Sequence, residues 1–481
     1  MKKNAKLFSF LCILLTLTTA QFSCGSETEP QETSTSDETT VEATEEYKFE
    51  SFPGYEFRVL NIQDIYSMHA VIDPGETNGD TLNDIQYNTV RLLEDKTGIT
   101  WKETNAEIEK EFPSIVSQMV LSGSDEYDLV YQNAKSFYSH ASQGFYYNLL
   151  DYSGVNTDAD WFIRSYNDYN TVSGKLYTAL GYSNLTVVDG TVCLLINQTM
   201  AENLGLEMPY DLVREGKWTI DKLKEYCTKA ANLNGESDFA WKSGGKSTYG
   251  ISIRQNSGTI WVVGGGEPVV DNKDGKLEFT GGTQRFYDVC DKVAGFLGTK
   301  DEGIVYYGNF DDNGDGSYIN CFENQRALFG DSEVAKTSRM RKLDFNFGVL
   351  PMPKYDELQD RYYTTISYPA SGMSIPVTCK TPERSASVGD AINYLFYTNV
   401  WNVFRNVTLE SKNLRNDDSV EMLGYVLNSI YPNVYYEFSI CTDFFTTMST
   451  KLRDGDSSIA STLAEYENRL QDDIDKVNLA D

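Results

Sequence analysis

Basic residues and histidines are scarce in this sequence. It has 41 lysines and arginines against 71 aspartates and glutamates, a formal net charge of −30, and 2 histidines. No lysine- or arginine-rich block interrupts this acidic composition. Nucleic acids and anionic lipid surfaces attract basic patches, so both are disfavoured as partners, and the acidity mainly favours solubility.

Long hydrophobic runs are also missing beyond the N-terminus. After residue 24 no apolar stretch reaches the roughly 18 residues that a membrane-spanning helix needs. The apolar run Leu7–Leu17 follows three lysines and precedes small residues up to Ala20. This order of basic, apolar and small residues is typical of an export signal, so residues 1–24 are predicted to be a signal peptide.

Two cleavage sites are compatible with this signal. Cleavage after Ala20 would release a free protein, whereas cleavage before Cys24 would leave a cysteine that can carry lipid. The residues around Cys24 resemble a bacterial lipobox, although Gln21 stands where leucine is usual. We expect a lipid anchor on Cys24, with free secretion as the alternative.

The segment after Cys24 is predicted to be a disordered acidic tether over residues 25–52. Residues 25–50 are mostly serine, threonine, glutamate, aspartate, glutamine and proline, a composition that cannot bury enough apolar surface to fold. The same composition would suit a disordered tail without an anchor.

Closely spaced cysteines are absent. No Cys-x-x-Cys pair occurs and histidines are few, so a zinc site is disfavoured. An exported chain could form disulfides, but one of this length does not need them, and we expect isolated buried thiols. The six cysteines after Cys24 are Cys193, Cys227, Cys290, Cys321, Cys379 and Cys441.

Motifs for catalysis or cofactor binding are incomplete. The run 244–247 resembles the end of a phosphate-binding loop, but Ala240 stands where glycine is required. Neither His69 nor His140 lies beside a Gly-x-Ser-x-Gly motif. A pair of catalytic carboxylates for glycoside hydrolysis remains possible, because the distance between two carboxylates is not visible in the sequence. We expect no resident cofactor, metal or enzymatic activity.

A partial calcium-loop pattern precedes a predicted helix at 318–328. Position 12 of the pattern is Phe322 instead of glutamate, so we interpret the segment as a polar turn. The matching residues are Asp311, Asn313, Asp315 and Gly316.

Alternating strands and helices predict an α/β fold with parallel pairing. In the first part, Thr81 is predicted to cap a helix that Gly98 ends, and a second helix ends at Gly123. The predicted strands are 55–61, 99–103, 127–131, 192–196, 249–253 and 345–350, and later helices are predicted from Thr219, at 384–408, at 419–430 and at 459–477.

Aromatic residues are abundant, with 32 tyrosines, 24 phenylalanines and 6 tryptophans. Tyrosine and tryptophan combine an apolar face with a polar edge, which suits the stacking and hydrogen bonding of a sugar ring. Most of these residues must form the core, so the enrichment favours carbohydrate as a ligand without selecting a residue.

The order of several short segments resembles the extracellular solute-binding proteins of ABC importers, in particular the sugar-binding group. The segments are 127–131, 174–177, 195–205, 216–219, 322–329, 347–354 and 419–423. The resemblance implies a two-lobed fold of the periplasmic-binding-protein type, each lobe a mainly parallel sheet flanked by helices. It places the first lobe at 53–185 and 360–412 and the second at 186–359 and 413–481.

The same resemblance implies capture of a carbohydrate in the cleft between the lobes and delivery to permease subunits when the lobes close. We expect a monomer held by its lipid at the outer face of the membrane in a cell without an outer membrane. The expected ligand contacts are Asp64, Tyr66, Tyr131, Gln132, Asn133, Arg254, Gln255, Asn256, Asp331, Tyr435 and Tyr436. Two alternatives remain open: a surface glycan-capture protein without a permease, and an exported glycan-cleaving enzyme.

Overall fold

The computed structural model describes residues 47–107, 111–134, 137–309, 314–414, 416–432 and 437–479. Contacts group residues 49–481 into one compact unit. The predicted signal peptide, Cys24 and residues 25–46 of the predicted tether lie outside the described residues. Within the described part of the chain, no helix combines the length and apolarity needed to cross a membrane.

The first sheet has the strand order β11-β3-β1-β2. Its strands are β1 (Glu56–Ile62), β2 (Thr100–Ala106), β3 (Leu129–Asn133) and β11 (Ser371–Ser374). β1 pairs in parallel with both β2 and β3, and β11 joins the edge antiparallel to β3. The predicted parallel strand–helix–strand arrangement is confirmed here.

Two helices connect these parallel strands. They are α1 (Thr81–Thr97) and α2 (Phe112–Ser122), closed by Gly98 and Gly123 at φ 73° and 68°, where glycine is tolerated without strain. The predicted cap of α1 is wrong by one residue. The Asp80 carboxylate accepts from the Leu82 amide at 2.9 Å, and its extended backbone places it just before the helix, so Thr81 is the first helical residue.

The second sheet has the strand order β10-β4-β9-β5-β8. Its pairings are mixed, since β5 is parallel to β8 and β9 whereas β4 is antiparallel to β9 and β10. Every residue of β4, β9 and β10 is buried, including the polar residues Asp331, Ser332 and Glu333 at the end of β9. The strands are β4 (Val192–Asn197), β5 (Tyr249–Arg254), β8 (Val305–Gly308), β9 (Ala327–Glu333) and β10 (Phe347–Leu350).

The helix predicted at 318–328 is shorter than expected. α11 (Tyr318–Glu323) ends in a turn in which Gln325 has φ 56° and the Arg326 amide bonds to the Cys321 carbonyl at 3.0 Å. The apolar residues from Ala327 onward then enter β9. The prediction failed because a glutamine instead of a glycine takes the left-handed turn position.

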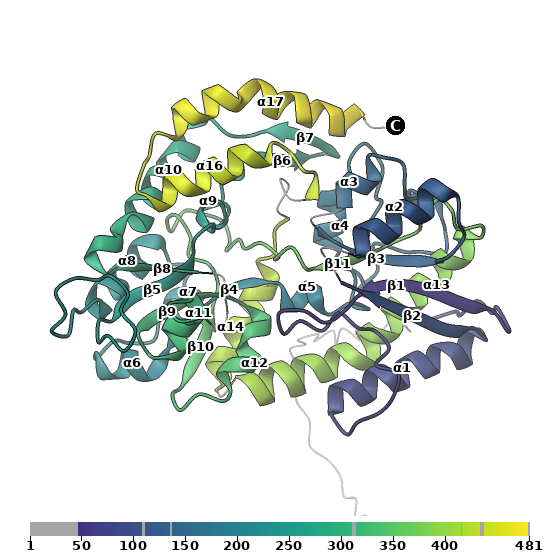
Figure 1. Ribbon diagram of the computed structural model, residues 1–481, viewed down its shortest axis with the longest axis horizontal. Coiled ribbons are helices and arrows are strands. Elements are labelled where there is room, and N and C mark those ends of the chain that lie inside the picture. Colours follow the sequence, from purple (N-terminus) through teal and green to yellow (C-terminus); the bar gives the residue numbers. More distant parts are fainter. Residues whose placement is uncertain are drawn as a thin grey trace, which may run out of the picture. The chain divides into compact units, whose positions relative to one another are not determined.

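The remaining helices cover the two sheets (Figure 1). α1 and α13 (Pro382–Leu395) pack against each other on one face of the first sheet, and α2 lies on the opposite face. The helix predicted at 384–408 is α13 only to Leu395, after which wider π-helical turns run to Asn413. The other helices are α3 (Phe137–Ala141), α4 (Arg164–Asn170), α5 (Thr186–Asp189), α6 (Gln198–Asn203), α7 (Tyr210–Arg214), α8 (Ile220–Ala230), α9 (Gly258–Gly264), α10 (Gln284–Leu297), α12 (Thr337–Met340), α13 (Pro382–Leu395), α14 (Asp417–Asn428), α16 (Thr442–Arg453) and α17 (Ile459–Leu479).

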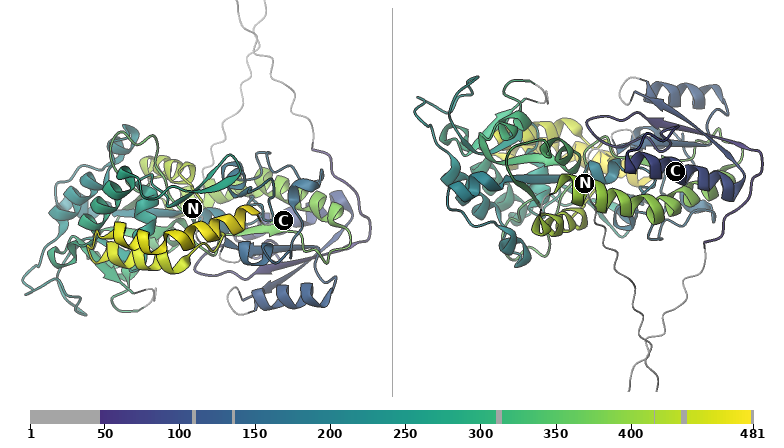
Figure 2. Two further views of the ribbon diagram at one scale, coloured as in Figure 1. Left: turned by 90° about the horizontal axis from the view of Figure 1, so that it is seen from above. Right: turned by 90° about the horizontal axis from the view of Figure 1, so that it is seen from below.

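A hairpin of β6 (Val270–Lys273) and β7 (Lys276–Phe279) lies beside α17. Figure 2 shows α17 running from the side of the second sheet toward the side of the first. Near its end, the Asn478 carbonyl accepts from the Ser173 hydroxyl at 2.7 Å, in the loop after α4. The end of α17 therefore connects the part of the chain around the second sheet with the loop after α4.

The six cysteines after Cys24 are free thiols, and all six are buried. Burial raises the pKa of the Cys227 thiol well above its ordinary value. These cysteines behave as small core residues, as the sequence predicts.

Candidate ligand-binding cleft

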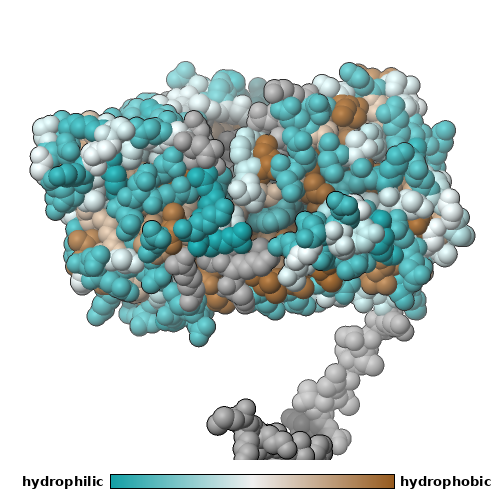
Figure 3. Space-filling model, turned by 60° about the horizontal axis from the view of Figure 1, so that its bottom comes forward, coloured by the Kyte–Doolittle hydropathy of each residue, from teal (hydrophilic) through white to brown (hydrophobic). Residues whose placement is uncertain are grey.

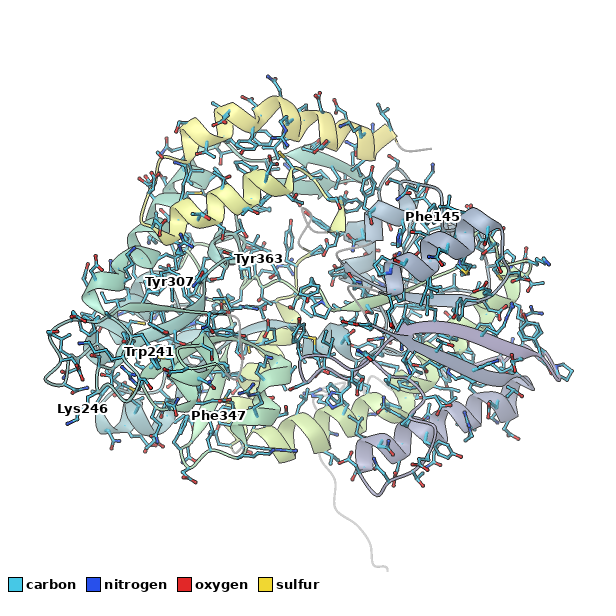
Figure 4. All side chains as sticks on the ribbon, viewed as in Figure 1. Phe145, Trp241, Lys246, Tyr307, Phe347 and Tyr363 are labelled. Atoms are coloured by element: carbon cyan, nitrogen blue, oxygen red, sulfur yellow. The ribbon has the colours of Figure 1, made fainter. Side chains whose placement is uncertain are left out.

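Three chain segments between the two sheets lie side by side. Thr191 forms a β-bridge with Ile366, and Thr364 forms one with Ile430. The Tyr431 amide donates to the Thr364 carbonyl at 2.7 Å. Figure 4 shows the neighbouring Tyr363 between the sheets, with Phe145 toward the first sheet and Tyr307 and Phe347 toward the second. This trio lies between the two sheets, which is where a hinge would bend.

A cavity of about 370 Å³ lies against the middle segment of this trio. Its volume is in the range of small-molecule sites. The first sheet contributes the loop after β1, and the second contributes the carboxyl ends of β5 and β9, where ligands commonly bind in α/β folds. The lining residues are Tyr66, Met68, Val192, Arg254, Asn256, Ser257, Ile260, Tyr318, Glu333, Lys336, Thr365, Ile366, Ser367 and Tyr368.

Arg254, at the end of β5, is held by two carboxylates of the adjacent strand β9. Its Nη2 and Nε lie 2.7 and 3.0 Å from the two carboxylate oxygens of Asp331, and its Nη1 bonds to Glu333. Because β5 and β9 are parallel neighbours, their carboxyl ends meet at one sheet edge. The resulting bidentate pair fixes the guanidinium in one plane.

The charge of Arg254 is secured by this environment. Burial would lower the pKa of its guanidinium, but Asp331 and Glu333 outweigh that effect and raise the pKa well above its ordinary value. The guanidinium also lies 5.9 Å from the ring centre of Tyr318. Arg254 is therefore a fixed cation in the wall of the cavity.

Tyr66 faces this wall from the loop after β1. Its hydroxyl accepts from the Tyr368 hydroxyl at 3.2 Å, and the two rings meet edge to face at 6.4 Å. The Lys336 ammonium, just after β9, lies 5.7 Å from the centre of the Tyr66 ring. These contacts join the two sides of the cavity.

The cavity combines apolar and hydrogen-bonding surface without a large excess charge. Arg254 and Lys336 are balanced by Glu333 and by Asp331 behind the wall. Methionine, valine and isoleucine side chains alternate with hydroxyl and amide groups along the rest of the lining. Such a surface suits a neutral polar solute with apolar faces. The face in Figure 3 is mostly hydrophilic, as the composition leads one to expect.

The structure places three of the predicted contact residues in the cavity lining: Tyr66, Arg254 and Asn256. Asp331 lies directly behind Arg254, where both of its carboxylate oxygens are used. Gln255 is exposed and does not appear among the described lining residues.

Four further predicted residues have other partners. The Asp64 carboxylate accepts from the amides of Ala70 and Val71 at 2.8 and 3.0 Å. Tyr131, Gln132 and Asn133 are buried in β3. The Tyr131 hydroxyl bonds to a serine hydroxyl, and the Gln132 amide donates to a threonine and a serine hydroxyl. Asn133 pairs with β11. Their contact with a ligand stays a prediction. Tyr435 and Tyr436 lie outside the described residues.

Several lining residues were not predicted. Glu333 and Lys336 follow Asp331 within five residues, so the end of a buried strand would have been a usable signal for them. Tyr318, Ser367 and Tyr368 come from segments far from any of the predicted contacts. No local pattern identifies these three, because only the fold brings them to the cavity.

Neither possible metal site gains support. Asp125, Asp128 and Cys379 lie close together, but the Arg58 guanidinium bonds to both carboxylates at 3.0 Å and supplies the positive charge. Of the calcium-loop residues, Asp311 and Asn313 lie outside the described part, and Asp315 accepts from the Trp241 indole at 3.3 Å.

No family model matches this sequence, and no curated protein matches it. Solved structures with similar folds exist. The cyclic α-maltosyl-1,6-maltose binding protein from Arthrobacter globiformis shares 13% identity over 88% of this chain and 99% of its own, with a TM-score of 0.59. UgpB from Mycobacterium tuberculosis, in complex with glycerophosphocholine, shares 13% identity over 89% of this chain and 99% of its own, with a TM-score of 0.55.

A third similar structure is the ABC substrate-binding protein Lmo0181 from Listeria monocytogenes in complex with cycloalternan. It shares 14% identity over 88% of this chain and 98% of its own, with a TM-score of 0.52. At sequence identities this low, the structural similarity establishes the fold alone. The chain has the two-lobed fold of these binding proteins, as the sequence predicts.

Proposed function

We propose that this chain is the substrate-binding component of an ABC importer. It captures a carbohydrate or oligosaccharide outside the cell and delivers it to a membrane permease by closing its lobes. The observation that carries the proposal is the cavity between the two sheets, with balanced charge and a lining of tyrosine rings, hydroxyls and one partly buried arginine. The similar folds of sugar-binding proteins support the same function.

The proposed lobes are residues 53–185 with 360–412 and residues 186–359 with 413–481. This division assigns the first sheet to one lobe and the second sheet to the other. The bridged segments at Thr191 and at Thr364–Ile366, close to the boundaries at 185/186 and 359/360, would then form part of the hinge. A ligand that touches both walls binds the closed state better than the open one, and this difference in affinity is what shifts the population.

We propose that the mature chain is a monomer anchored by lipid on Cys24 at the outer face of the membrane. The export signal and the lipobox-like residues support the anchor. The test is metabolic labelling with a fatty acid, in which the native chain takes up label and the Cys24→Ser chain does not.

Enzymatic activity is not part of the proposal. Glycoside hydrolysis needs two carboxylic groups on opposite sides of the scissile bond. Among the described lining residues Glu333 is the single carboxylate, and it is bonded to Arg254. Product formation from an oligosaccharide mixture would overturn this assignment.

The proposed function is tested by a ligand panel. Mono- and oligosaccharides, polyols, peptides and glycerophosphocholine are added singly while intrinsic tryptophan fluorescence and thermal unfolding are recorded. A solute at 100 times its Kd should stabilise the native state by about 2.7 kcal/mol. We expect at least one carbohydrate to change both signals, and no response to any carbohydrate would contradict the proposal.

A further inference from the structure

The chain contains three asparagine–glycine steps, at 78–79, 234–235 and 313–314. In such a step the glycine amide nitrogen can attack the side-chain carbonyl carbon of the asparagine, because glycine has no Cβ atom to hinder the approach. The asparagine at 313 lies outside the described residues. The other two steps are both exposed, so exposure does not distinguish them.

The Asn78 side chain folds back over the main chain that follows it, in the loop before α1. Its Oδ1 atom accepts from the Asp80 amide at 2.8 Å. An asparagine oxygen bonded to the amide two residues on closes a turn, and this turn places the Asn78 carbonyl group beside the intervening Gly79 nitrogen. The Asp80 amide also polarises that carbonyl group and would stabilise the negative charge that develops on its oxygen during attack.

The Gly79 nitrogen has a carboxylate acceptor. The Asp84 Oδ1 atom accepts from the Gly79 amide at 3.2 Å and from the Asn78 amide at 2.9 Å. A carboxylate in this position can take the amide proton as the nitrogen attacks, which is the role of a general base. Asp84 belongs to the first turn of α1, so the helix holds it beside the loop. The loop thus brings together a nucleophile, a proton acceptor and a polarised carbonyl group.

The side chain of Asn234 is held in a different way. Its Nδ2 atom donates to the Lys246 carbonyl at 2.9 Å and lies 3.4 Å from the Thr248 hydroxyl. Both contacts direct the amide across the loop, and both would have to break before this nitrogen could leave. We therefore expect Asn234 to react more slowly than Asn78.

We propose that Asn78 is a site of spontaneous deamidation in the folded protein. The Gly79 nitrogen forms a bond to the Asn78 Cγ atom while its proton passes to Asp84. The bond between Cγ and Nδ2 then breaks, and Nδ2 leaves with that proton as ammonia, which gives a succinimide ring. Water opens the ring at one of its two carbonyl carbons, and the product is aspartate or isoaspartate at position 78. Each event replaces a neutral amide with a carboxylate.

The modified loop borders a hollow other than the solute cavity. Asn78 lines a space of about 260 Å³ together with His69 and Asp80. Residues 78–84 are not among the described residues that line the solute cavity. The inference is therefore independent of the proposed function, and a chain that binds no solute would still test it.

The first experiment follows the native chain during incubation near neutral pH. Samples are digested under mildly acidic conditions, and peptides are separated and weighed, since deamidation adds about one dalton. We expect the peptide with Asn78 to change at least about tenfold faster than the peptide with Asn234, a ratio that corresponds to about 1.4 kcal/mol of activation free energy. Equal rates, or no change at Asn78, would contradict the proposal.

The same incubation in concentrated urea separates the fold from the local sequence. Unfolding removes the contacts of Asp80 and Asp84 with the loop and those of Lys246 and Thr248 with Asn234. The two peptides should then react at similar rates. A preference for Asn78 that persists in urea would show that the folded loop does not cause it.

Variants test the role of Asp84. Asp84→Asn keeps the size of the side chain but is a much weaker proton acceptor, so reaction at Asn78 should slow about tenfold while reaction at Asn234 is unchanged. Asp95→Asn, near the other end of α1, is the matched control and should react at the native rate. Asn78→Asp supplies the product for comparison, and circular dichroism checks that each variant is folded. A native rate in Asp84→Asn, or equal slowing in Asp95→Asn, would remove Asp84 from the proposal.

Discussion

The side-chain amide of Asn272 in β6 donates to the carbonyl oxygen of Thr171, the residue after α4, at 3.0 Å. The same nitrogen lies 2.5 Å from the Tyr169 carbonyl. The hairpin that carries Asn272 belongs to the proposed second lobe, whereas Tyr169 and Thr171 belong to the first. One amide group thus links the two proposed lobes away from the cavity.

Asn272→Asp should loosen this link. The variant keeps an oxygen to accept from the Gly275 amide, but it places a carboxylate against two carbonyl oxygens. The ligand-free lobes should open, and apparent affinity should fall because less of the protein is in the binding-competent closed state.

Small-angle scattering and calorimetry check this prediction. The radius of gyration of the ligand-free variant should rise, and its Kd should increase about threefold to tenfold. Gln143→Ala is the control, since Gln143 donates to a carbonyl of its own helix turn, Ser139. An unchanged radius and Kd in Asn272→Asp would show that the link does not govern closure.

Replacing Arg254 should destabilise the second lobe strongly. Arg254→Met leaves Asp331 and Glu333 buried without their counter-ion, which costs about 3–5 kcal/mol of unfolding free energy. Arg254→Lys should recover only part of this loss, because lysine cannot bond to Asp331 in a bidentate manner.

Urea unfolding measures these changes. Arg214 is the control, because it pairs with Glu421 and Asp418 at the surface, where water screens the pair. Arg214→Met should therefore change the unfolding free energy much less. A similar loss in both variants would mean that the Arg254 ion pairs contribute no more to stability than the Arg214 pairs at the surface.

His69 should make stability depend on alkaline pH. Burial would lower the pKa of His69, but the Asp189 carboxylate at 2.8 Å outweighs it, with help from Asp64 and Asp80, and raises the pKa to about 9. The folded state thus binds the proton more tightly than the unfolded state, whose histidine pKa is about 6.5. The stabilisation is complete below that value and disappears as pH rises through about 9.

The prediction is checked by measuring the unfolding free energy by chemical denaturation between pH 6 and 10, a range that spans both pKa values. His69→Gln should flatten the decline in unfolding free energy. His140→Gln should not, because burial lowers the pKa of His140 and its contribution changes only at acid pH. If the unfolding free energy of His69→Gln still declines with rising pH, groups other than His69 cause the decline.

The sequence predicts the fold better than it predicts the site. Alternating patterns and glycine ends located β1, α1, β2, α2 and β3, because each depends on neighbours in the chain. The left-handed turn at Gln325 was missed since it carries no glycine.

The cavity was harder to predict than the strands. Tyr66, Arg254 and Asn256 follow strand ends and were found, but Tyr318 and Tyr368 reach the cavity only through the crossing of distant segments. Such positions are a property of the tertiary fold, which no short window of sequence contains.

The buried thiols should resist modification in the native state. A chain that begins after Cys24 should show almost no rapid reaction with a thiol reagent, and the six thiols should react after unfolding. Burial, which raises the pKa of Cys227 and its counterparts, removes both access and thiolate. Rapid reaction of native protein would show that one of these cysteines is accessible.

The most direct test of solute capture by lobe closure is the distance between labels on the two lobes. Leu121 and Leu358 are 79% and 90% exposed and lie in the proposed first and second lobes, so Leu121→Cys with Leu358→Cys provides label sites while the native thiols stay buried. Fluorescence energy transfer is measured as the sugar that binds is added. The account predicts that transfer changes toward a more closed form, saturating at the Kd found by calorimetry. Saturating sugar with no change in transfer would contradict closure as the mechanism.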